Sequence, residues 1–534
     1  MRLLYSIFAR PRAASLRQLT LLALLLAPVL AGALPPITMV GARFAYADPL
    51  PNYTSAVDFS EDPKALGYTD SRKIVRDSAG RLYIAYRKKY KLQYETAYHV
   101  FVARSTDDGA TWQVLNQNQP IEQVGDFNQR VPAIAVDHND VLHVIWYGCD
   151  ARSAAEDENQ IKYTRSVDHG VSWSPWQTIS HVVGYGNQSM WQEHPVLFVD
   201  NRNTLYVAWE GRDQHYPDTS QIKFVKSTDG GASWSIWANI APANYNHSRP
   251  TLVATQQGVL YVLAYGSMGG LQQILYTRSA DNGLSWLSWR PVAPMAQEQR
   301  HVSVAVDAID RLHAVWRQST ASFFTQHRTE QIYYATLTDR GWSRPERVSP
   351  DDQVVQTYPS ITADEAGALW VTWQETGIED RGTEEMPLTG AIYYAYSLSK
   401  GWSPPLLLAD NHGEFFPSLR RLSPFDSGEE QSSPIDLVWL SRQGATLAIR
   451  FAHLMRPPVE AQGSGMAHTA FANDVGATGA AATVNPHLSY NASWFLPSKD
   501  LQRELQSMLM IVVCVSLYVM IKFVISRWLQ DETW

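Results

Sequence analysis

Apolar and polar residues alternate with period two along the middle of the chain. Leu142, Val144 and Trp146 illustrate the alternation, and Leu205, Val207 and Trp209 repeat it further along. Because successive side chains of a strand point to opposite faces, this period indicates β-strands, whereas helices require a period of 3.6. No amphipathic helix of useful length separates these strands, so a parallel α/β fold is excluded.

The alternating segments form a repeat. A turn residue, often followed by Pro, opens a strand that runs into Asp; a short polar turn follows, and a second strand ends in an aromatic residue. Clear copies begin at Arg130, His194, Arg249, His301 and Tyr358, and weaker copies begin at Arg72 and Phe416. A spacing of roughly 57 residues fits four short strands plus loops. We therefore predict an all-β fold, a β-propeller of four-stranded antiparallel blades, with seven blades expected and six as the alternative.

A shorter motif, S-x-D-x-G-x-[ST]-W, follows the third strand in four repeats, and worn copies begin at Thr336 and Ser397. Its Asp can accept backbone N–H bonds across the turn, its Gly supplies a positive φ, and its Trp is expected to pack under the turn. These are therefore predicted to be structural residues and not catalytic ones: Asp107, Asp168, Asp229 and Asp281, with Trp112, Trp173, Trp234 and Trp286.

Four copies in phase resemble the Asp boxes, or bacterial neuraminidase repeats, of the sialidase superfamily, over about Ser55 to Met455. The resemblance implies that the first strand of each blade is innermost and that the box joins the third strand to the fourth. Ring closure is predicted to use about Ala56 to Tyr68 to complete the last blade. The chain departs from the family in two ways: sialidases have six blades, and their R-I-P signature opens the first blade, whereas Arg130-Val131-Pro132 opens the second repeat.

The turns that enter first strands and leave second strands share one face of a propeller and converge on its axis, where propellers bind ligands. Arginines are frequent in these turns, and planar guanidinium groups can hold a carboxylate bidentately. The sequence therefore predicts a pocket for an anionic sugar. The clamp candidates are Arg130, Arg300 and Arg317, and the further substrate-binding candidates are Arg249, Arg212, His194 and His301.

The resemblance to sialidases also implies a Tyr nucleophile paired with a Glu, and an Asp acid/base. Tyr358 with Glu193 or Glu210 is the candidate pair, and Asp150 or Asp213 is the candidate acid. In the alternative interpretation these charges are loop residues that form salt bridges around a solvated channel mouth. Two functions follow: a glycoside hydrolase resembling an exo-alpha-sialidase, or a non-catalytic propeller that binds a surface glycan or protein partner.

Both chain ends carry membrane signals. Residues 1–47 combine Arg2, Arg10 and Arg12 with an apolar stretch and small-residue sites, which indicates a secretory signal peptide; an uncleaved anchor helix is the alternative. The propeller is assigned to 48–455 and a stalk rich in Ala, Gly and Thr to 456–503. Residues 504–526 are predicted to cross a bilayer, with a buried or interfacial helix as the alternative, and 527–534 form a short cytoplasmic tail. We expect a single-pass membrane protein whose propeller is extracytoplasmic.

Net charge, cysteine content and the absence of metal-binding motifs exclude several classes of partner and cofactor. The net charge is −8 and no run of Lys and Arg follows a nucleic-acid backbone, so nucleic acid is not an expected partner. Only two cysteines are present, Cys149 and Cys514, in different segments, so no disulfide is expected. The sequence shows no Cys/His metal pattern and no Gly-rich phosphate loop, so neither a metal nor a cofactor is expected.

Overall fold

The computed structural model describes residues 54–151, 159–182, 189–321, 328–350, 354–377, 389–398, 401–410, 413–420 and 434–454. These belong to a compact unit that extends to Arg456. The predicted signal peptide, stalk, membrane span and tail lie outside the described residues. Within those ranges, no helix has the length and apolarity needed to cross a bilayer.

The described chain is all-β, and most of it forms four-stranded antiparallel meanders, each named here by its first strand. The β2 unit holds β2 (Ile74–Arg76), β3 (Leu82–Lys91), β4 (Thr96–Ser105) and β5 (Gln113–Val114). The β6 unit holds β6 (Gln129–Val136), β7 (Leu142–Gly148), β8 (Gln160–Ser166) and β9 (Gln177–Thr178). The β10 unit holds β10 (Gln192–Val199), β11 (Leu205–Asp213), β12 (Tyr216–Ser227) and β13 (Ala238–Asn239). The β14 unit holds β14 (His247–Ala254), β15 (Leu260–Gly266), β16 (Gln273–Ser279) and β17 (Arg290–Pro291).

A ten-stranded sheet contains the next two meanders, which are joined by a single parallel pair, Glu330 with Val355. The β18 unit holds β18 (Gln299–Val306), β19 (Leu312–Ala321), β20 (Arg328–Thr338), β21 (Gly341–Trp342) and β22 (Glu346–Arg347). The β23 unit holds β23 (Val354–Ala363), β24 (Leu369–Gly377), β25 (Ala391–Leu398), β26 (Gly401–Trp402) and β27 (Leu406–Ala409). Short turns α3 (Leu115–Asn118) and η2 (Met268–Gly270) are the helical elements that the described residues contain.

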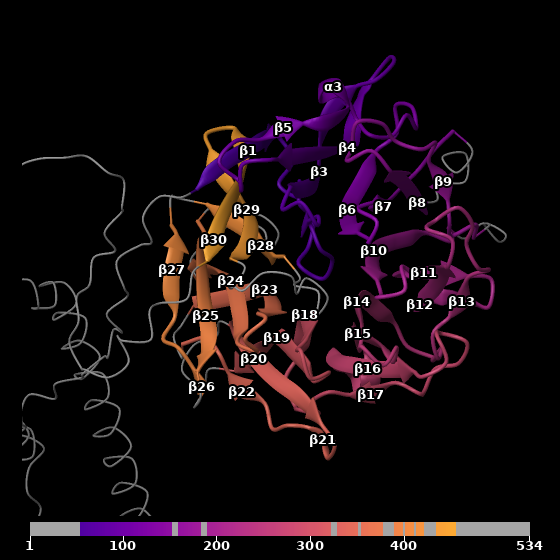
Figure 1. Cartoon of the computed structure of the whole chain (residues 1–534). Helices are drawn as coiled ribbons and strands as arrows, with labels where there is room; N and C mark the ends of the chain where they lie inside the picture. Colours follow the sequence, from indigo (N-terminus) through magenta and orange to yellow (C-terminus); the bar gives the residue numbers. More distant parts are fainter. Residues whose placement is uncertain are drawn as a thin grey trace, which may run out of the picture. The chain divides into compact units, whose positions relative to one another are not determined.

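The last meander is closed by the first strand of the chain, as predicted. The β28 unit holds β28 (Glu414–Leu419), β29 (Ile435–Gln443) and β30 (Thr446–Leu454), and β1 (Ser55–Ser60) pairs with β30 as its fourth strand. The units follow one another around a ring (Figure 1). The predicted closing segment was too long, however, because only its first residues form the strand and the rest turns into the ring.

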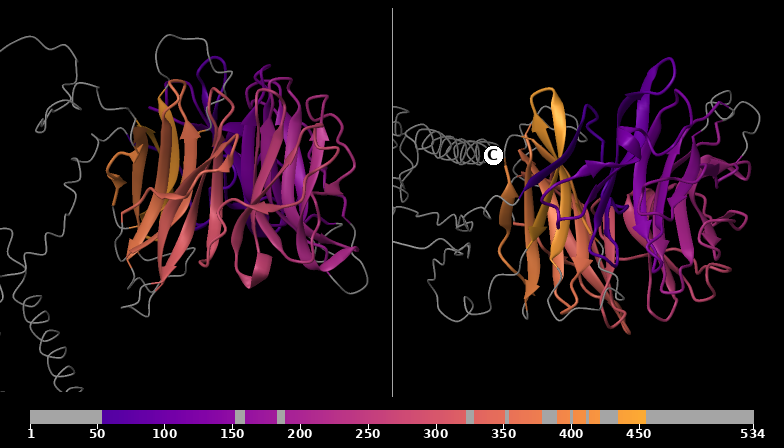
Figure 2. Two further views of the ribbon diagram at one scale, coloured as in Figure 1. Left: turned by 90° about the horizontal axis from the view of Figure 1, so that it is seen from below. Right: turned by 45° about the horizontal axis from the view of Figure 1, so that its top comes forward.

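The ring has two ends, between which the strands of every unit run (Figure 2). We call the end that carries the four Asp boxes (105–112, 166–173, 227–234 and 279–286) the box face, and the opposite end, where first strands begin, the hub face. Turns between first and second strands also lie at the box face, since Arg81 contacts the His169 ring of the next box at 3.0 Å. The hairpins between second and third strands therefore lie at the hub face.

Each box is an internal hydrogen-bond network. The Asp107 carboxylate accepts the Thr111 N–H at 2.9 Å, the Thr111 hydroxyl at 2.6 Å and the Ser105 hydroxyl at 2.8 Å. The hydrogen bonds from Thr111 and Ser105 lower the pKa of Asp107 to about 2. Asp168, Asp229 and Asp281 accept the same set within their own boxes. These carboxylates are fully engaged in the turns, which is what a structural role requires.

The box tryptophans connect neighbouring units. Trp112 donates to the Gly109 carbonyl of its own box at 3.1 Å, but its ring lies edge-on against Phe451 of the β28 unit at 5.3 Å. Trp234 meets Tyr163, and Trp286 meets Phe224, in the same way. The worn copies keep this contact through Trp342 and Trp402. The tryptophan therefore bridges two units, where the sequence predicted only packing under its own turn.

A second carboxylate lock closes the turn at the end of most first strands. Asp200 accepts the N–H groups of Arg202 and Thr204 at 2.9 and 2.8 Å, and the Tyr206 hydroxyl at 3.0 Å. Asp307 repeats this arrangement with the imidazole of His313 at 3.1 Å. Where the first strand of a repeat runs into Asp, that Asp thus fixes the turn and the second strand together.

The glycine of each box lies directly against a side chain of the neighbouring unit. Gly231 has φ +83°, and a Cβ there would lie 1.8 Å from Tyr163 Oη, whereas Gly258 has φ +82° and nothing within 4 Å. We expect Gly231→Ala to lower the free energy of unfolding by about 2–4 kcal/mol, since it adds a steric clash to backbone strain. Gly258→Ala should lower it by only about 1 kcal/mol. Urea unfolding followed by tryptophan fluorescence measures both, and equal losses would contradict the interlocking of adjacent units.

Candidate functional site

Side chains from most first strands are turned toward the ring centre by a repeated backbone irregularity. Each of these strands has a register shift, and the residue at the shift adopts a left-handed conformation with φ between 47° and 53°. Such a conformation is strained for residues other than glycine and persists only where its surroundings hold it. The residues concerned are Val131, His194, Arg249, His301, Tyr358 and Phe416.

All six of these residues surround one loop. Residues 61–73, between β1 and β2, enter the ring centre (Figure 1). Tyr68, which is 3% exposed, stands at the centre of the contacts. Its ring lies 5.4 Å from His194, 6.4 Å from His301, 6.1 Å from Tyr358 and 5.9 Å from Phe416, centroid to centroid. Val131 packs against the neighbouring Gly67. The predicted convergence of the turns on the axis is therefore confirmed, but the centre is filled by a loop that the sequence did not reveal.

Arg249 is the guanidinium nearest to this centre. Its Cζ lies 3.4 Å from the Tyr68 ring centroid, a face-on cation–π contact. Burial would lower the pKa of Arg249, but Tyr265, Tyr68, Asp70 and Glu210 together raise it, so the group remains charged. Its Nη1 is buried and has no hydrogen-bond partner among the described residues. Arg249 thus holds a fixed positive charge with an unused donor.

Two carboxylates lie on the β10 unit, and one of them, Glu210, acts electrostatically on Arg249. Glu193 and Glu210 are cross-strand partners on β10 and β11, and Glu210 is hydrogen-bonded to His194 Nδ1. Burial opposes ionisation of Glu210, but His194 and Arg249 more than offset it and lower its pKa. Glu193 accepts the Asn159 amide at 2.7 Å. Both carboxylates are therefore already held by neighbouring groups.

Two of the predicted clamp arginines are adjacent. Arg300 and Arg317 are cross-strand partners on β18 and β19, so their Cβ atoms lie roughly 5 Å apart. Arg317 is bound to Glu330 at 2.6 Å and to Thr357 at 3.3 Å, whereas Arg300 faces Glu298 at 3.7 Å. Arg300 is about one-third exposed, and its Nε is buried without a hydrogen-bond partner among the described residues.

Tyr265 is a site residue that the sequence reasoning missed. It lies near the end of β15, at the cross-strand position that Glu210 and Arg317 occupy in their own units. Burial raises the pKa of Tyr265, and Arg249, Glu210 and Arg300 all act on it electrostatically. Its ring also lies 6.2 Å from His301. The available signal was positional, since Ala264-Tyr265-Gly266 aligns with Trp209-Glu210-Gly211 in the repeat.

Tyr358, the predicted nucleophile, lies among aromatic side chains of the hub. It is 1% exposed and packs against His301 at 4.6 Å and Phe416 at 4.7 Å. Glu210, one of its two predicted partners, acts electrostatically on Tyr265. The environment of Tyr358 is thus that of a packed hub residue.

The two predicted acids are both held in ion pairs with lysines. Asp213 is bound to Lys223 at 2.5 Å and to the Asn239 amide at 2.8 Å. Burial opposes ionisation of Asp213, but Lys223 and Asn239 outweigh it and lower its pKa. Asp150 is paired with Lys162 at the equivalent place in the β6 unit. A proton donor needs a raised pKa at neutral pH, so this environment does not fit Asp213 as the acid.

Asp70 is a carboxylate of a different kind. It lies in the central loop, is 8% exposed, and neither of its oxygens has a hydrogen-bond partner among the described residues. It acts electrostatically on Lys73 and Arg249. Burial lowers the pKa of Lys73 to about 7, although Asp70 opposes this. A buried carboxylate that lies near Arg249 and accepts no hydrogen bond from the described residues is uncommon for a residue with a purely structural role.

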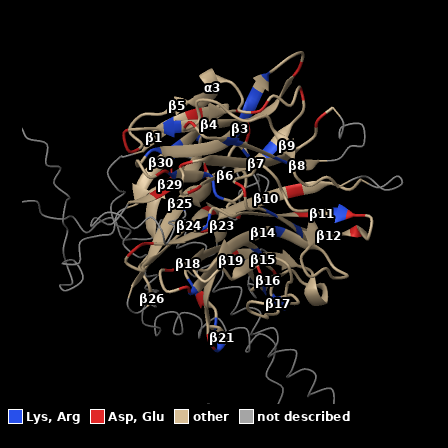
Figure 3. Cartoon of the chain, turned by 45° about the vertical axis from the view of Figure 1, so that its right-hand side comes forward, with Lys and Arg blue, Asp and Glu red and all other residues tan. Residues whose placement is uncertain are grey.

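Arg130 and Arg212 are the predicted substrate-binding arginines that remain to be placed. Arg130 is exposed and is the cross-strand partner of Tyr147. Arg212 stands 5.7 Å from the Trp191 ring, and its Nε is buried without a hydrogen-bond partner among the described residues. Basic and acidic segments are interspersed over the strands in Figure 3. The described ranges contain no cluster of three or more His, Cys, Asp or Glu side chains suited to a metal ion.

These positions form an arc at the hub face over the β6, β10, β14 and β18 units. In chain order it runs through Arg130, Tyr147, Glu193, His194, Glu210, Arg249, Tyr265, Arg300, His301 and Arg317. We call this set the hub arc. Tyr68 and Asp70 of the central loop lie next to its middle, at Arg249. The arc contains guanidinium groups, two carboxylates, two histidines and two tyrosines.

Comparisons with known proteins agree with this architecture. A family profile described as "BNR repeat-like domain" matches residues 140–415, more than half of the chain. A search of curated protein sequences finds no match.

Several solved structures are similar. A mutant NanB sialidase from Streptococcus pneumoniae is 14% identical over 61% of this chain and 68% of its own, with a TM-score of 0.41. An alpha-L-arabinanase from Penicillium chrysogenum is 16% identical over 60% of this chain and 92% of its own, with a TM-score of 0.43. A protein of unknown function from Dyadobacter fermentans is 13% identical over 66% of this chain and 97% of its own, with a TM-score of 0.40. Likenesses at this level carry no information on activity.

Proposed function

The chain belongs to the family of BNR repeat-like domains, and on that footing we propose that its propeller recognises an acidic sugar of a glycan at the hub arc. The family match confirms the resemblance of the boxes to those of the sialidase superfamily. Recognition of the sugar is the function that the geometry supports best. Hydrolysis of the glycan is a second candidate.

One observation carries this proposal: two buried guanidinium nitrogens of the hub arc have no hydrogen-bond acceptor within the part of the chain that the structure describes. Arg249 Nη1 and Arg300 Nε are both in this position, and both arginines act on Tyr265. A buried donor left unmet costs about 1–3 kcal/mol, and more when the group is charged. A sugar carboxylate remains ionised at neutral pH and would satisfy both groups.

Binding measurements test the proposal. We expect N-acetylneuraminic acid to bind the parent chain, and Arg249→Gln to weaken that binding by about 30- to 100-fold, because about 2–3 kcal/mol of charge-assisted hydrogen bonding is lost. Arg278→Gln is the matched control, since Arg278 is exposed next to a box on the opposite face. Isothermal titration calorimetry measures the affinities. Equal affinities for Arg249→Gln and Arg278→Gln would contradict the proposal.

The second candidate, hydrolysis, is favoured by Tyr265. A tyrosine beside a carboxylate and two arginines provides the kind of nucleophile that the sialidase resemblance implies. Asp70, which also acts on Tyr265, would then be the candidate acid, because Asp150 and Asp213 are paired with lysines. A fluorogenic sialoside should be cleaved by the parent and not by Tyr265→Phe. Binding of the sugar without turnover in the parent would leave recognition as the function.

We also propose that the propeller has seven blades. Each of the seven meanders that the described residues form would be one blade, including the two within the ten-stranded sheet. The single parallel pair between β20 and β23 supports this division, since neighbouring strands within these meanders share longer runs of pairs. Seven lies within the usual range of four to eight blades.

The membrane anchor remains a proposal that rests on the sequence. The apolar run from Met508 to Ile525 is long enough to cross a bilayer core, and the N-terminal signal would place the propeller outside the cell. Under this proposal the hub arc meets glycans at the cell exterior.

A further inference from the structure

Both ends of the described chain lie at the box face. His453, next to the end of β30, contacts the Asp108 carbonyl of the first box at 2.9 Å. Ser55, at the start of β1, accepts the indole N–H of Trp112 from the same box at 2.9 Å. The segments that precede β1 and follow β30 therefore leave the propeller on this side. In the sequence, the apolar run that begins at Met508 follows Leu454.

The same face carries most of the large exposed aliphatic side chains among the described residues. They stand in the boxes, directly after them, or in a turn between first and second strands. These are Val167 (70% exposed), Val171 (67%), Ile236 (92%), Leu284 (80%), Leu287 (51%) and Ile309 (70%). They belong to the β6, β10, β14 and β18 units, which follow one another around the ring. Single exposed aliphatic residues are ordinary, but six at the loop tips of one face indicate an interaction surface.

The tips that carry these residues are held in fixed relative positions. Arg165, which precedes the second box, donates to the Gly230 carbonyl of the third box. Lys226, which precedes the third box, donates to the Asn282 carbonyl of the fourth box at 2.8 Å. Because each basic side chain reaches the next box, the second, third and fourth boxes, which bear five of the six aliphatic side chains in or directly after them, are held in fixed positions relative to one another.

Charges on this face do not favour an anionic or a cationic partner. Arg202, Arg278 and Arg311 are exposed there, and the box carboxylates Asp229 and Asp281 are exposed as well. Long basic side chains can keep their charge in the headgroup layer while neighbouring aliphatic groups enter the acyl region. The pattern therefore suits a zwitterionic lipid surface, with apolar insertion as the main attraction.

We propose that the box face docks on a lipid bilayer, with the six aliphatic side chains inserted at its interface. We call these six side chains the box-face array. The proposed partner of the box-face array is a membrane, and not a second copy of the chain or another protein. Both chain ends leave from this face, and the sequence that follows contains an apolar run long enough to span a bilayer core. Docking in this way would turn the hub arc away from the membrane, toward external glycans.

The test uses the full chain reconstituted into phosphatidylcholine vesicles, with Cys149 and Cys514 replaced by Ser. A polarity-sensitive fluorophore is attached at Ile236→Cys or Leu284→Cys. The matched control is Tyr94→Cys, because Tyr94 is 84% exposed at the tip of the β3–β4 hairpin on the hub face. Spin-labelled lipid in the vesicles reports contact with the bilayer.

We expect a blue-shifted emission that spin-labelled lipid quenches at Ile236→Cys and Leu284→Cys, and a water-like, unquenched emission at Tyr94→Cys. High salt should change neither result. With the label at Val171→Cys, adding Ile236→Ser and Leu284→Ser should reduce the quenching. These positions are exposed, so the substitutions leave the fold intact.

Four outcomes would overturn the proposal. The labels on the box face could remain water-like, or Tyr94→Cys could be quenched equally. A blue shift that grows with protein density but is not quenched by lipid would assign the face to contact between copies. A chain that fails to float with the vesicles would overturn the docking and the anchor together. Sugar binding in solution tests glycan recognition separately, so the failure of one proposal is distinguishable from that of the other.

Discussion

Arg72→Met is expected to lower the free energy of unfolding of the propeller by about 3–5 kcal/mol. The Arg72 guanidinium donates to the carbonyls of Val304 and Ile361 at 3.0 Å, to the Leu419 carbonyl at 3.3 Å and to the Ser360 hydroxyl at 3.2 Å. These acceptors belong to the innermost strands of three units, β18, β23 and β28. One side chain from the central loop therefore connects three units across the hub.

The size of this effect follows from the number of acceptors that lose their donor. A hydrogen bond to a charged group contributes about 1.5–3 kcal/mol, and an unmet buried carbonyl costs about 1–3 kcal/mol. Burial lowers the pKa of Arg72 to about 10, so the guanidinium is still charged at neutral pH. Arg72→Lys keeps the charge but lacks the planar fork, and it should restore only part of the stability.

Arg311→Met is the matched control for Arg72→Met. Arg311 is also held by a polar contact, an ion pair with Asp307 at 2.8 Å, but its side chain is 53% exposed, so its loss should cost less than about 1 kcal/mol. Urea unfolding followed by tryptophan fluorescence compares the variants. Similar losses for the two would mean that Arg72 does not connect the units as described.

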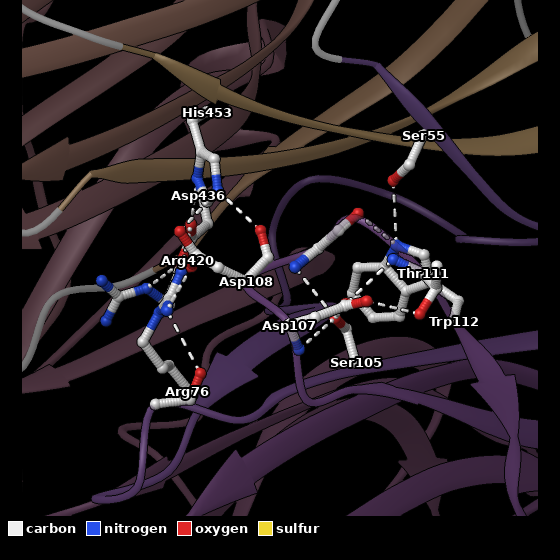
Figure 4. Close-up of polar contacts among 12 residues, drawn as sticks. Ser55, Arg76, Ser105, Asp107, Asp108, Thr111, Trp112, Arg420, Asp436 and His453 are labelled. Atoms are coloured by element: carbon white, nitrogen blue, oxygen red, sulfur yellow. Dashed lines mark hydrogen bonds and ion pairs between the residues drawn. The ribbon is translucent and has the colours of Figure 1, made fainter. Parts of the chain in front are cut away.

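Asp436→Asn should be comparably destabilising, by about 3–5 kcal/mol, because it removes the anion from a buried cluster at the ring closure. Asp436 is fully buried and is bound to Arg76 at 2.9 Å, Arg420 at 2.5 Å and His453 at 2.9 Å. Figure 4 shows these residues converging between the β2 and β28 units. Asp108 completes the group by contacting Arg76 at 2.6 Å.

This cluster also predicts how the stability of the parent chain depends on pH. Burial opposes ionisation of Asp436, but His453, Arg420 and Arg76 outweigh it and lower its pKa to about 2. Its contribution is complete above its ordinary pKa of 3.8 and is lost as the pH falls toward 2. Burial would lower the pKa of His453, but Asp436 and Asp108 raise it above 6.5. That contribution is complete below pH 6.5 and is lost as the pH rises through the raised value.

The stability difference between the parent and Asp436→Asn should therefore be largest between pH 3.8 and 6.5. Denaturant unfolding across that range, and above and below it, measures the difference. Asp108→Asn is the control, since the Asp108 side chain is 60% exposed and should contribute less than about 1 kcal/mol. A difference that does not change with pH would exclude the coupling between His453 and Asp436.

The repeating features of the fold could be predicted from the sequence because each repeat reports its own local physics. Period-two alternation gave the strands, and the Asp-Gly-Trp spacing located the turns between third and fourth strands. The contact of Trp112 with Phe451 could not be predicted in this way, because it joins residues from opposite ends of the chain. Sequence spacing within one repeat contains no information on which neighbour its tryptophan meets.

Only those residues of the candidate site that occupy equivalent positions in the repeats could be predicted from the sequence. Arg249, His194 and His301 occupy equivalent places in their units, so their convergence could be inferred. The central loop carries no repeat and no motif, and Tyr68 gave no signal of the contacts it makes. The pairing of Asp213 with Lys223 was missed for another reason: a lone lysine on a strand is usually exposed, but Lys223 is fully buried.

A crystal structure of the chain with N-acetylneuraminic acid bound tests the central claim most directly. The account predicts that the sugar carboxylate lies against Arg249 Nη1 and Arg300 Nε, with the Arg249 guanidinium still stacked on the Tyr68 ring. A sugar bound away from these arginines, or a hub without Tyr68 at its centre, would contradict it.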